Sequence, residues 1–141
     1  MSKPATKRDF REESIQRHMR RCRHFNGTSN GKCEVGVSYD TVREPGELLV
    51  CIDPEAKASC SQCSRPTREE AEALQQEQHE AIVRIGKARA AIVEATGGKR
   101  GVRGAIDCPC CQGGRLSYSV AGINGHIWAG CSTKGCVSWM E

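Results

Sequence analysis

The sequence of 141 residues contains few aromatic side chains: two tryptophans, two tyrosines and two phenylalanines. With 38% hydrophobic residues it can bury only a thin core, and units below about 70–80 residues with such cores usually need disulfides or bound metal. The longest purely apolar run is Leu48–Ile52, far below the roughly 20 residues that cross a bilayer, so a membrane protein is not expected. The first fourteen residues are charged and hold no apolar segment, which argues against a secretory signal and favours a cytoplasmic protein.

The net charge of +4 is modest, but the charges are unevenly distributed. Residues 1–24 carry a net charge of +5 and residues 97–141 carry +3, whereas the acidic middle of the chain carries the compensating negative charge. Two basic ends are suited to contact with a polyanion. The densest basic stretch, at Arg20 and Arg21, belongs to a basic arm over residues 1–21, which we interpret as a flexible tail or a short helix.

Cysteine, by contrast, is abundant, with ten residues. Thiols stay reduced in the cytosol, where closely spaced cysteines more often hold metal, and disulfides are the alternative. We therefore expect a small α+β fold stabilised by metal. Its segments in chain order are a basic arm (1–21), a cysteine-rich metal-binding module (22–66), a long helix (67–97), a basic glycine-rich linker (98–107) and a C4 zinc ribbon (108–141).

A long helix over residues 68–96 is the clearest prediction of secondary structure. Thr67 is suited to the N-cap, and Glu70 completes a capping box. Two glycines directly after residue 96 end the helix. Apolar residues recur on one face between Leu74 and Ile92. This stripe either packs on the cysteine-rich modules or pairs with a second copy, which would give a dimer through the long helix.

The C-terminal segment has the spacing of a zinc ribbon. It offers two close pairs of cysteines, Cys108 with Cys111 and Cys131 with Cys136. Zinc is commonly held by four such ligands from two turns. Between the pairs, alternation over residues 116–121 and a two-residue turn at Asn124-Gly125 predict a hairpin. Cys110 is either a spare thiol or a replacement for Cys111, and His126 is expected on the hairpin surface rather than on the metal.

This segment resembles the C4 zinc ribbons at the C-terminal end of bacterial type IA topoisomerases. The shared pattern, over about residues 106–139, is C-P-x-C, G-x-L, a glycine followed by an aromatic, and a closing C-x4-C. In that family the ribbons bind single-stranded DNA through an aromatic residue whose position corresponds to Trp128. The resemblance implies flanking charge from Arg115 and Lys134. The chain departs from the pattern in its extra cysteine and its hairpin turn, and no topoisomerase catalytic domain fits in the remainder.

The N-terminal module offers five thiols at irregular spacing: Cys22, Cys33, Cys51, Cys60 and Cys63. We favour the first four in chain order as ligands of a second zinc ion, with Cys63 as a competitor and His24 as a further candidate. An iron–sulfur cluster is the alternative, since four thiolates suit it equally. The segments Val35–Tyr39 and Leu48–Ile52 are predicted as strands on either side of a turn.

Over nearly its full length the chain is also similar to a loosely defined set of small cysteine-rich proteins of bacteriophages and prophages. The matching stretches are Cys22–Gly27, Cys33 with Gly36–Tyr39, Pro66–Glu70 and Trp139–Glu141. No activity is attached to that set. The resemblance therefore implies a phage accessory protein in the cytoplasm of the host bacterium, and nothing more.

The leading expectation is a non-catalytic zinc protein that binds nucleic acid, single-stranded DNA or RNA. The basic arm and Lys99, Arg100 and Arg103 would contact phosphates, while bases stack on Trp128; core packing is the alternative role for this tryptophan. A second expectation is a protein-interaction module that binds and modulates a host protein or protein complex. The sequence shows no phosphate loop and no recognisable nucleophile–base pair, so an enzyme is not expected.

Overall fold

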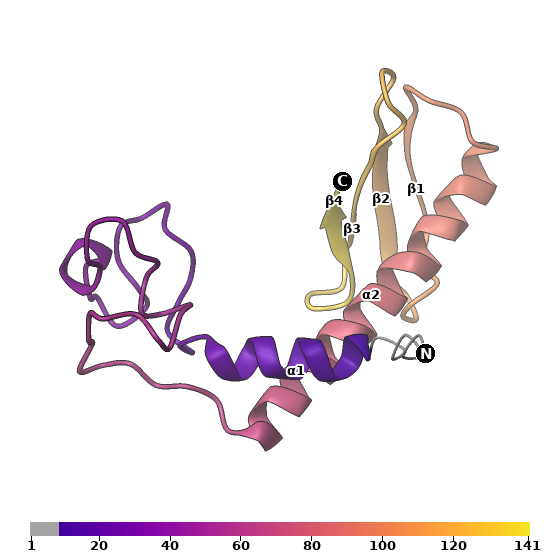
Figure 1. Cartoon of the computed structure of the whole chain (residues 1–141). Coiled ribbons are helices and arrows are strands. Elements are labelled where there is room, and N and C mark those ends of the chain that lie inside the picture. Colours follow the sequence, from indigo (N-terminus) through magenta and orange to yellow (C-terminus); the bar gives the residue numbers. More distant parts are fainter. Residues whose placement is uncertain (1–8) are drawn as a thin grey trace, which may run out of the picture. The chain divides into compact units, whose positions relative to one another are not determined.

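The computed structural model describes residues 9–141 and has the predicted α+β composition (Figure 1). Its elements are α1 (Phe10–Arg20), the 3-10 helix η1 (Tyr39–Val42), α2 (Arg68–Thr96), and the strands β1 (Arg103–Asp107), β2 (Arg115–Val120), β3 (Ile127–Cys131) and β4 (Ser138–Met140). The chain forms two compact units, one ending at Gln76 and one beginning at Glu77, and α2 contributes to both. No helix in the described part of the chain is long and apolar enough to cross a membrane.

The first helix, α1, shows that most of the predicted basic arm is folded. Asp9 caps it, because its Oδ1 accepts the backbone N–H groups of Arg11 and Glu12 at 3.1 Å each. Ile15 is fully buried. Glu12 also accepts two bonds from the Arg68 guanidinium, at 2.9 and 2.7 Å. The helix alternative is therefore confirmed from residue 10 onward, and residues 1–8 of the arm lie outside the described part.

The long helix α2 has the predicted start and end. The Thr67 N–H donates to Glu70 Oε2 at 2.7 Å, and the Glu70 N–H donates to Thr67 Oγ1 at 3.3 Å, which is the expected capping box. Arg23 adds two bonds of 3.0 Å to the same Glu70 carboxylate. Gly97 and Gly98 end the helix with φ of 61° and 75°, values that L side chains rarely adopt.

The two strands predicted in residues 22–66 are wrong. Within Val35–Tyr39, the Gly36 N–H donates to Cys33 O at 2.9 Å, so the chain turns there at a positive φ of 84°. Within Leu48–Ile52, the Leu49 carbonyl accepts from the N–H groups of residues 52 and 53, each at 3.0 Å. Both apolar stretches therefore form local turns. The hydrogen bonds within these turns use backbone N–H and C=O groups that, in a strand, would bond to a partner strand.

The core of the first unit is small and built largely around cysteine. Its buried members are Cys22, Tyr39, Val42, Leu49, Val50 and Cys51. Three more cysteines of the same segment pack partly buried against it: Cys33, Cys60 and Cys63. A core with so few large aliphatic side chains provides little hydrophobic stabilisation.

The second unit is a four-stranded antiparallel sheet in the order β1-β2-β3-β4, packed on the C-terminal part of α2 (Figure 1). Ala88 and Ile92 of α2 are fully buried in one core with Leu116 of β2. The apolar stripe predicted for the long helix thus packs within the chain in this part. Ile82, in contrast, is 60% exposed.

Two sequence predictions for the second unit are wrong. Residues 103–107 of the predicted linker form β1, which pairs with β2 along its whole length. Gly104 contributed to the prediction of a flexible linker, but in the structure it leaves space for the Tyr118 side chain. A Cβ at residue 104 would lie 2.7 Å from the Tyr118 hydroxyl oxygen. The hairpin after β2 closes through a loop over residues 121–126 rather than a two-residue turn: the Ala121 N–H donates to His126 O at 2.9 Å.

Candidate metal centre

Four cysteines of the second unit converge at one end of the sheet, and we call them the four-cysteine cluster: Cys108, Cys111, Cys131 and Cys136. All four Sγ atoms lie within 4.8 Å of one another. The shortest separations are 3.7 Å from Cys108 to Cys136 and 3.6 Å from Cys111 to Cys131. With Zn–S bonds of about 2.3 Å, sulfurs in a tetrahedron lie about 3.8 Å apart. The cluster therefore fits one metal ion such as zinc, and within residues 9–141 no other group of ligands is this close.

Strand pairing brings the two cysteine turns together. β2 pairs with β1 on one side and with β3 on the other, so the turn after β1 lies next to the end of β3. Within the first turn, the Cys108 N–H donates to Gly114 O at 2.9 Å. In the second, the Cys131 N–H donates to Val137 O at the same distance. The sheet thus places the two cysteine turns side by side.

Gly114 leaves free the space beside the sulfurs that a side chain would occupy. A Cβ at this position would lie 2.6 Å from the Sγ atoms of both Cys111 and Cys131, and 2.9 Å from Thr133 Oγ1. Real Cβ atoms essentially never approach other atoms below 3.0 Å. The cluster therefore requires glycine at residue 114 for reasons of space.

The thiols of the cluster differ in how readily they ionise. The Thr133 backbone N–H, which donates to Cys131 Sγ at 3.3 Å, lowers the pKa of the Cys131 thiol to about 7. Burial has the opposite effect on Cys108 and Cys136 and raises the pKa of both thiols. Because metals bind thiolates, Cys131 is the ligand most ready to take an ion at neutral pH. Nothing in the sequence pointed to Thr133 beyond its position two residues after a cysteine.

The other candidate ligands near the cluster lie outside it. The Cys110 thiol donates instead to the Arg84 carbonyl of α2, at 3.4 Å. His126 is exposed in the loop after β2 and is not among the clustered ligands.

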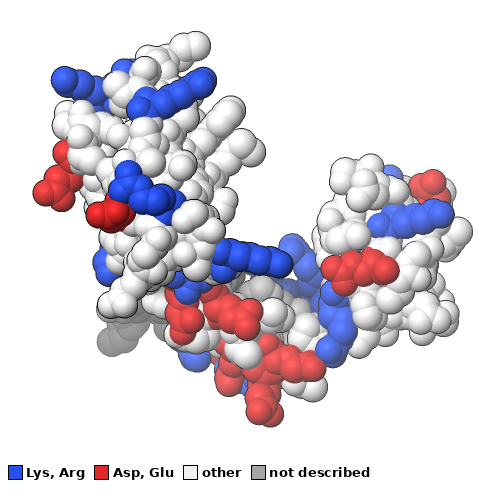
Figure 2. All heavy atoms as spheres, turned by 180° about the vertical axis from the view of Figure 1, so that it is seen from behind, with Lys and Arg blue, Asp and Glu red and all other residues white. Residues whose placement is uncertain are grey.

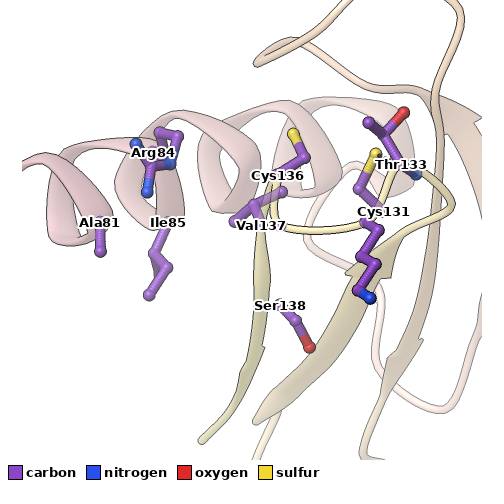
Figure 3. Close-up of a pocket in the computed structure, with 10 residues that line it drawn as sticks. Ala81, Arg84, Ile85, Cys131, Thr133, Cys136, Val137 and Ser138 are labelled. Atoms are coloured by element: carbon purple, nitrogen blue, oxygen red, sulfur yellow. Dashed lines mark hydrogen bonds between the residues drawn. The ribbon is translucent and has the colours of Figure 1, made fainter.

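A pocket of about 310 Å³ lies beside the cluster, between α2 and the turn that joins β3 to β4 (Figure 3). Cys131 and Cys136 line it from the turn, and Arg84 lines it from α2. Lys134 also lines this pocket. A divalent ion with four thiolates carries a net negative charge, so the two cationic side chains are placed where they offset it.

The N-terminal cysteines lie around a different pocket, in the first unit. All five of them line it, namely Cys22, Cys33, Cys51, Cys60 and Cys63, together with His24. Their sulfurs are not as close to one another as those of the four-cysteine cluster. Burial raises the pKa of the Cys51 thiol and of the Cys63 thiol.

Of the residues predicted to contact nucleic acid, three share the open face of the sheet. Trp128 is 56% exposed, and the strand register places it in one cross-strand row with Ser119 and Arg103. Arg115 lies on the same face, four residues before Ser119 on β2, and its guanidinium donates to Asp107 Oδ1 at 2.7 Å. The sequence could not show this shared face, because it depends on the pairing register.

The other predicted basic residues lie elsewhere. Lys99 and Arg100 line a pocket beside the loop after β2, where Arg100 donates to Ile123 O at 3.2 Å. Arg20 and Arg21 belong to the first unit, and the Arg21 guanidinium lies 5.6 Å from the centre of the Phe25 ring. On the face that Figure 2 shows, acidic side chains gather around the first part of α2, and lysines and arginines are spread over the sheet unit.

The two tryptophans have different environments. Trp139 of β4 is partly buried and packs against the core of the second unit, whereas Trp128 is largely exposed. Core packing therefore accounts for Trp139, and only Trp128 is presented on the sheet face.

In comparisons with known proteins, no family model, no curated protein and no solved structure matches this chain.

Proposed function

We propose that the chain is a non-catalytic zinc-binding protein, in which the four-cysteine cluster and the sheet form a zinc ribbon whose open face binds single-stranded nucleic acid. The observation that carries the proposal is the exposed Trp128 in one row with Arg103. An aromatic ring and a guanidinium two strands apart on one face offer what single strands need, since bases stack on the ring while phosphates meet the cation.

The surroundings of Trp128 favour a stacked base. A shallow depression of about 400 Å³ runs along this face and is lined by Ser117, Ser119 and Met140 besides the indole. Small hydroxyl side chains leave the ring accessible from above, and Met140 is 74% exposed beside it. A base on the indole would gain roughly 1–3 kcal/mol, irrespective of its identity, because every base has a π-face.

The proposed role of zinc is structural. Four thiolates complete a tetrahedral shell and leave no open position for water or substrate. The ion would hold the turn after β1 against the turn after β3, and thereby fix the strand register that places Trp128 and Arg103 in one row. The resemblance to topoisomerase ribbons supports this role, and the resemblance to phage proteins supports an accessory protein in the host cytoplasm.

The test is fluorescence anisotropy with labelled single-stranded oligonucleotides of DNA and of RNA, at several salt concentrations. Trp128→Ala should weaken binding by about 5–150-fold, which corresponds to the loss of 1–3 kcal/mol of stacking. Ile123→Ala is the matched control, because Ile123 is 94% exposed on the same unit but lies in the loop after β2, outside the row. Zinc content of each variant is checked by native mass spectrometry.

Salt dependence adds a second criterion. For single strands, the logarithm of the affinity falls against the logarithm of salt with a slope of about −0.7 per phosphate neutralised. Arg103→Gln should flatten this slope. Absence of binding at low salt, or equal affinity of Trp128→Ala and Ile123→Ala, contradicts the proposal.

A second candidate function is docking on a host protein. Exposed apolar side chains on α2 favour this function. Ile82 and Val83 are 60% and 55% exposed. Ile82→Ser should abolish capture of a host complex that survives nuclease treatment, and should leave oligonucleotide binding unchanged. Sedimentation of the same variant tests a dimer through α2, since a dimer that uses Ile82 would dissociate.

A further inference from the structure

The first unit gathers all of its cysteines around one point. Its five cysteines are separated by up to 41 positions in the sequence, yet each lines the same buried pocket. Cysteine is often buried as a small apolar residue, but scattered core cysteines have no reason to share one pocket. Over its described residues, 9–76, the unit has no named strand and only a small core. A unit with so small a core needs a cross-link for stability, and reduced thiols provide one by binding a metal ion.

The pocket between the cysteines is small. Its volume is about 10 Å³, roughly the space of one water-sized sphere. This size favours a single ion over an iron–sulfur cluster, which consists of several iron and sulfide atoms.

Two pairs of cysteines meet at this pocket. The Cys63 N–H donates to Cys60 O at 3.2 Å, so these two form a tight C-x2-C turn. The Cys22 N–H donates to Cys51 O at 2.7 Å, and both of these residues are buried. The Ser64 N–H joins the pairs, because it donates to the Cys22 sulfur at 3.5 Å. Backbone N–H groups directed at sulfur stabilise thiolates, as metal ligands require.

Cys33 belongs to neither pair. Its N–H donates to Val37 O at 3.0 Å and its carbonyl accepts from the Gly36 N–H at 2.9 Å, and none of its hydrogen bonds reaches the other four cysteines. We propose that the pocket is a second metal centre, in which Cys22, Cys51, Cys60 and Cys63 hold one zinc ion and Cys33 is a spare thiol. The sulfurs are more widely spaced than in the four-cysteine cluster, and binding would draw them together. This site lies in the first unit and is independent of the nucleic-acid surface.

The experiment is native mass spectrometry of the full chain, expressed with zinc and purified without oxygen. The unaltered protein should carry two zinc ions, Cys51→Ser should carry one, and Cys33→Ser, the matched control, should keep two. A single zinc ion on the unaltered chain, or the mass of an iron–sulfur cluster, overturns the proposal. Loss of zinc from Cys33→Ser with retention in Cys63→Ser overturns the ligand assignment.

A second measurement does not depend on the folding of a variant. The unaltered, zinc-loaded protein is treated with N-ethylmaleimide and the modified cysteines are mapped by peptide mass spectrometry. Cys33 and Cys110 should be modified first, while the four proposed ligands stay protected until a chelator removes zinc. Rapid modification of Cys60 and Cys63 in the zinc-loaded protein contradicts the site, whatever the state of the four-cysteine cluster.

Discussion

Gly114→Ala tests whether the four-cysteine cluster is a metal site whose geometry depends on the absence of one side chain. The substitution adds a single methyl group, and the residue is not a ligand. Its effect must therefore come from the position of that methyl group, 2.6 Å from the sulfurs of both Cys111 and Cys131.

The expected magnitude follows from these distances. Ordinary van der Waals contact begins at 3.4 Å, so each sulfur or the backbone must move by about 0.8 Å. Metal–ligand distances are held within about 0.2 Å of their preferred values, so a shift of this size is about four times the tolerance. Changes next to metal ligands typically cost 10–100-fold in affinity. We expect Gly114→Ala to weaken zinc binding by about 100-fold or more, because it affects two ligands at once.

The assay is competition with a chromophoric zinc chelator, followed by thermal unfolding of the zinc-loaded protein. Gly86→Ala in α2 is the first control: a Cβ there meets nothing within 4 Å, and alanine should stabilise the helix by about 0.5–1 kcal/mol. Gly113→Ala is the second control. Its φ of 77° makes alanine strained by roughly 1–2 kcal/mol, but the methyl group has no contact with sulfur.

The comparison between the three variants decides the matter. If Gly114→Ala retains zinc as tightly as Gly86→Ala, the sulfur positions do not define a metal site and the reasoning is refuted. If Gly113→Ala loses as much zinc as Gly114→Ala, backbone strain in the turn is responsible rather than contact with the sulfurs.

Three further predictions concern residues around the site and the helix. Cys110→Ser should leave zinc binding in the chelator assay unchanged, since its thiol donates to the Arg84 carbonyl; a weaker affinity would make Cys110 a ligand. Leu116→Ala should lower the free energy of unfolding by about 2–5 kcal/mol, because Leu116 is fully buried. Guanidinium titration followed by tryptophan fluorescence measures this, and a loss below about 1 kcal/mol would contradict the assigned core. Thr67→Ala should cost about 1 kcal/mol through loss of the helix cap, measured by circular dichroism; an unchanged midpoint would contradict the cap.

Local signals in the sequence were sufficient for some elements. The α2 helix was predicted with its bounds because its cap, its apolar period and its terminal glycines all act within a few residues. The four cysteines of the cluster were predicted because their spacing is itself the ligand pattern of zinc. The predicted strands over Val35–Tyr39 and Leu48–Ile52 failed because short apolar runs do not distinguish a strand from a turn that packs on a small core.

The candidate metal ligands and the two ends of the long helix could be predicted from short stretches of sequence, since spacing and capping depend on neighbouring residues. The surfaces and pockets that these residues form depend instead on contacts between distant segments. Strand register placed Trp128 and Arg103, 25 positions apart in the chain, in one row on the sheet. Residues 103–107 of the predicted linker form β1 because they pair with β2, and no local sequence pattern reveals the hydrogen bonds of that pairing. Packing likewise brought five irregularly spaced cysteines to one pocket, since burial is fixed by contacts between distant segments.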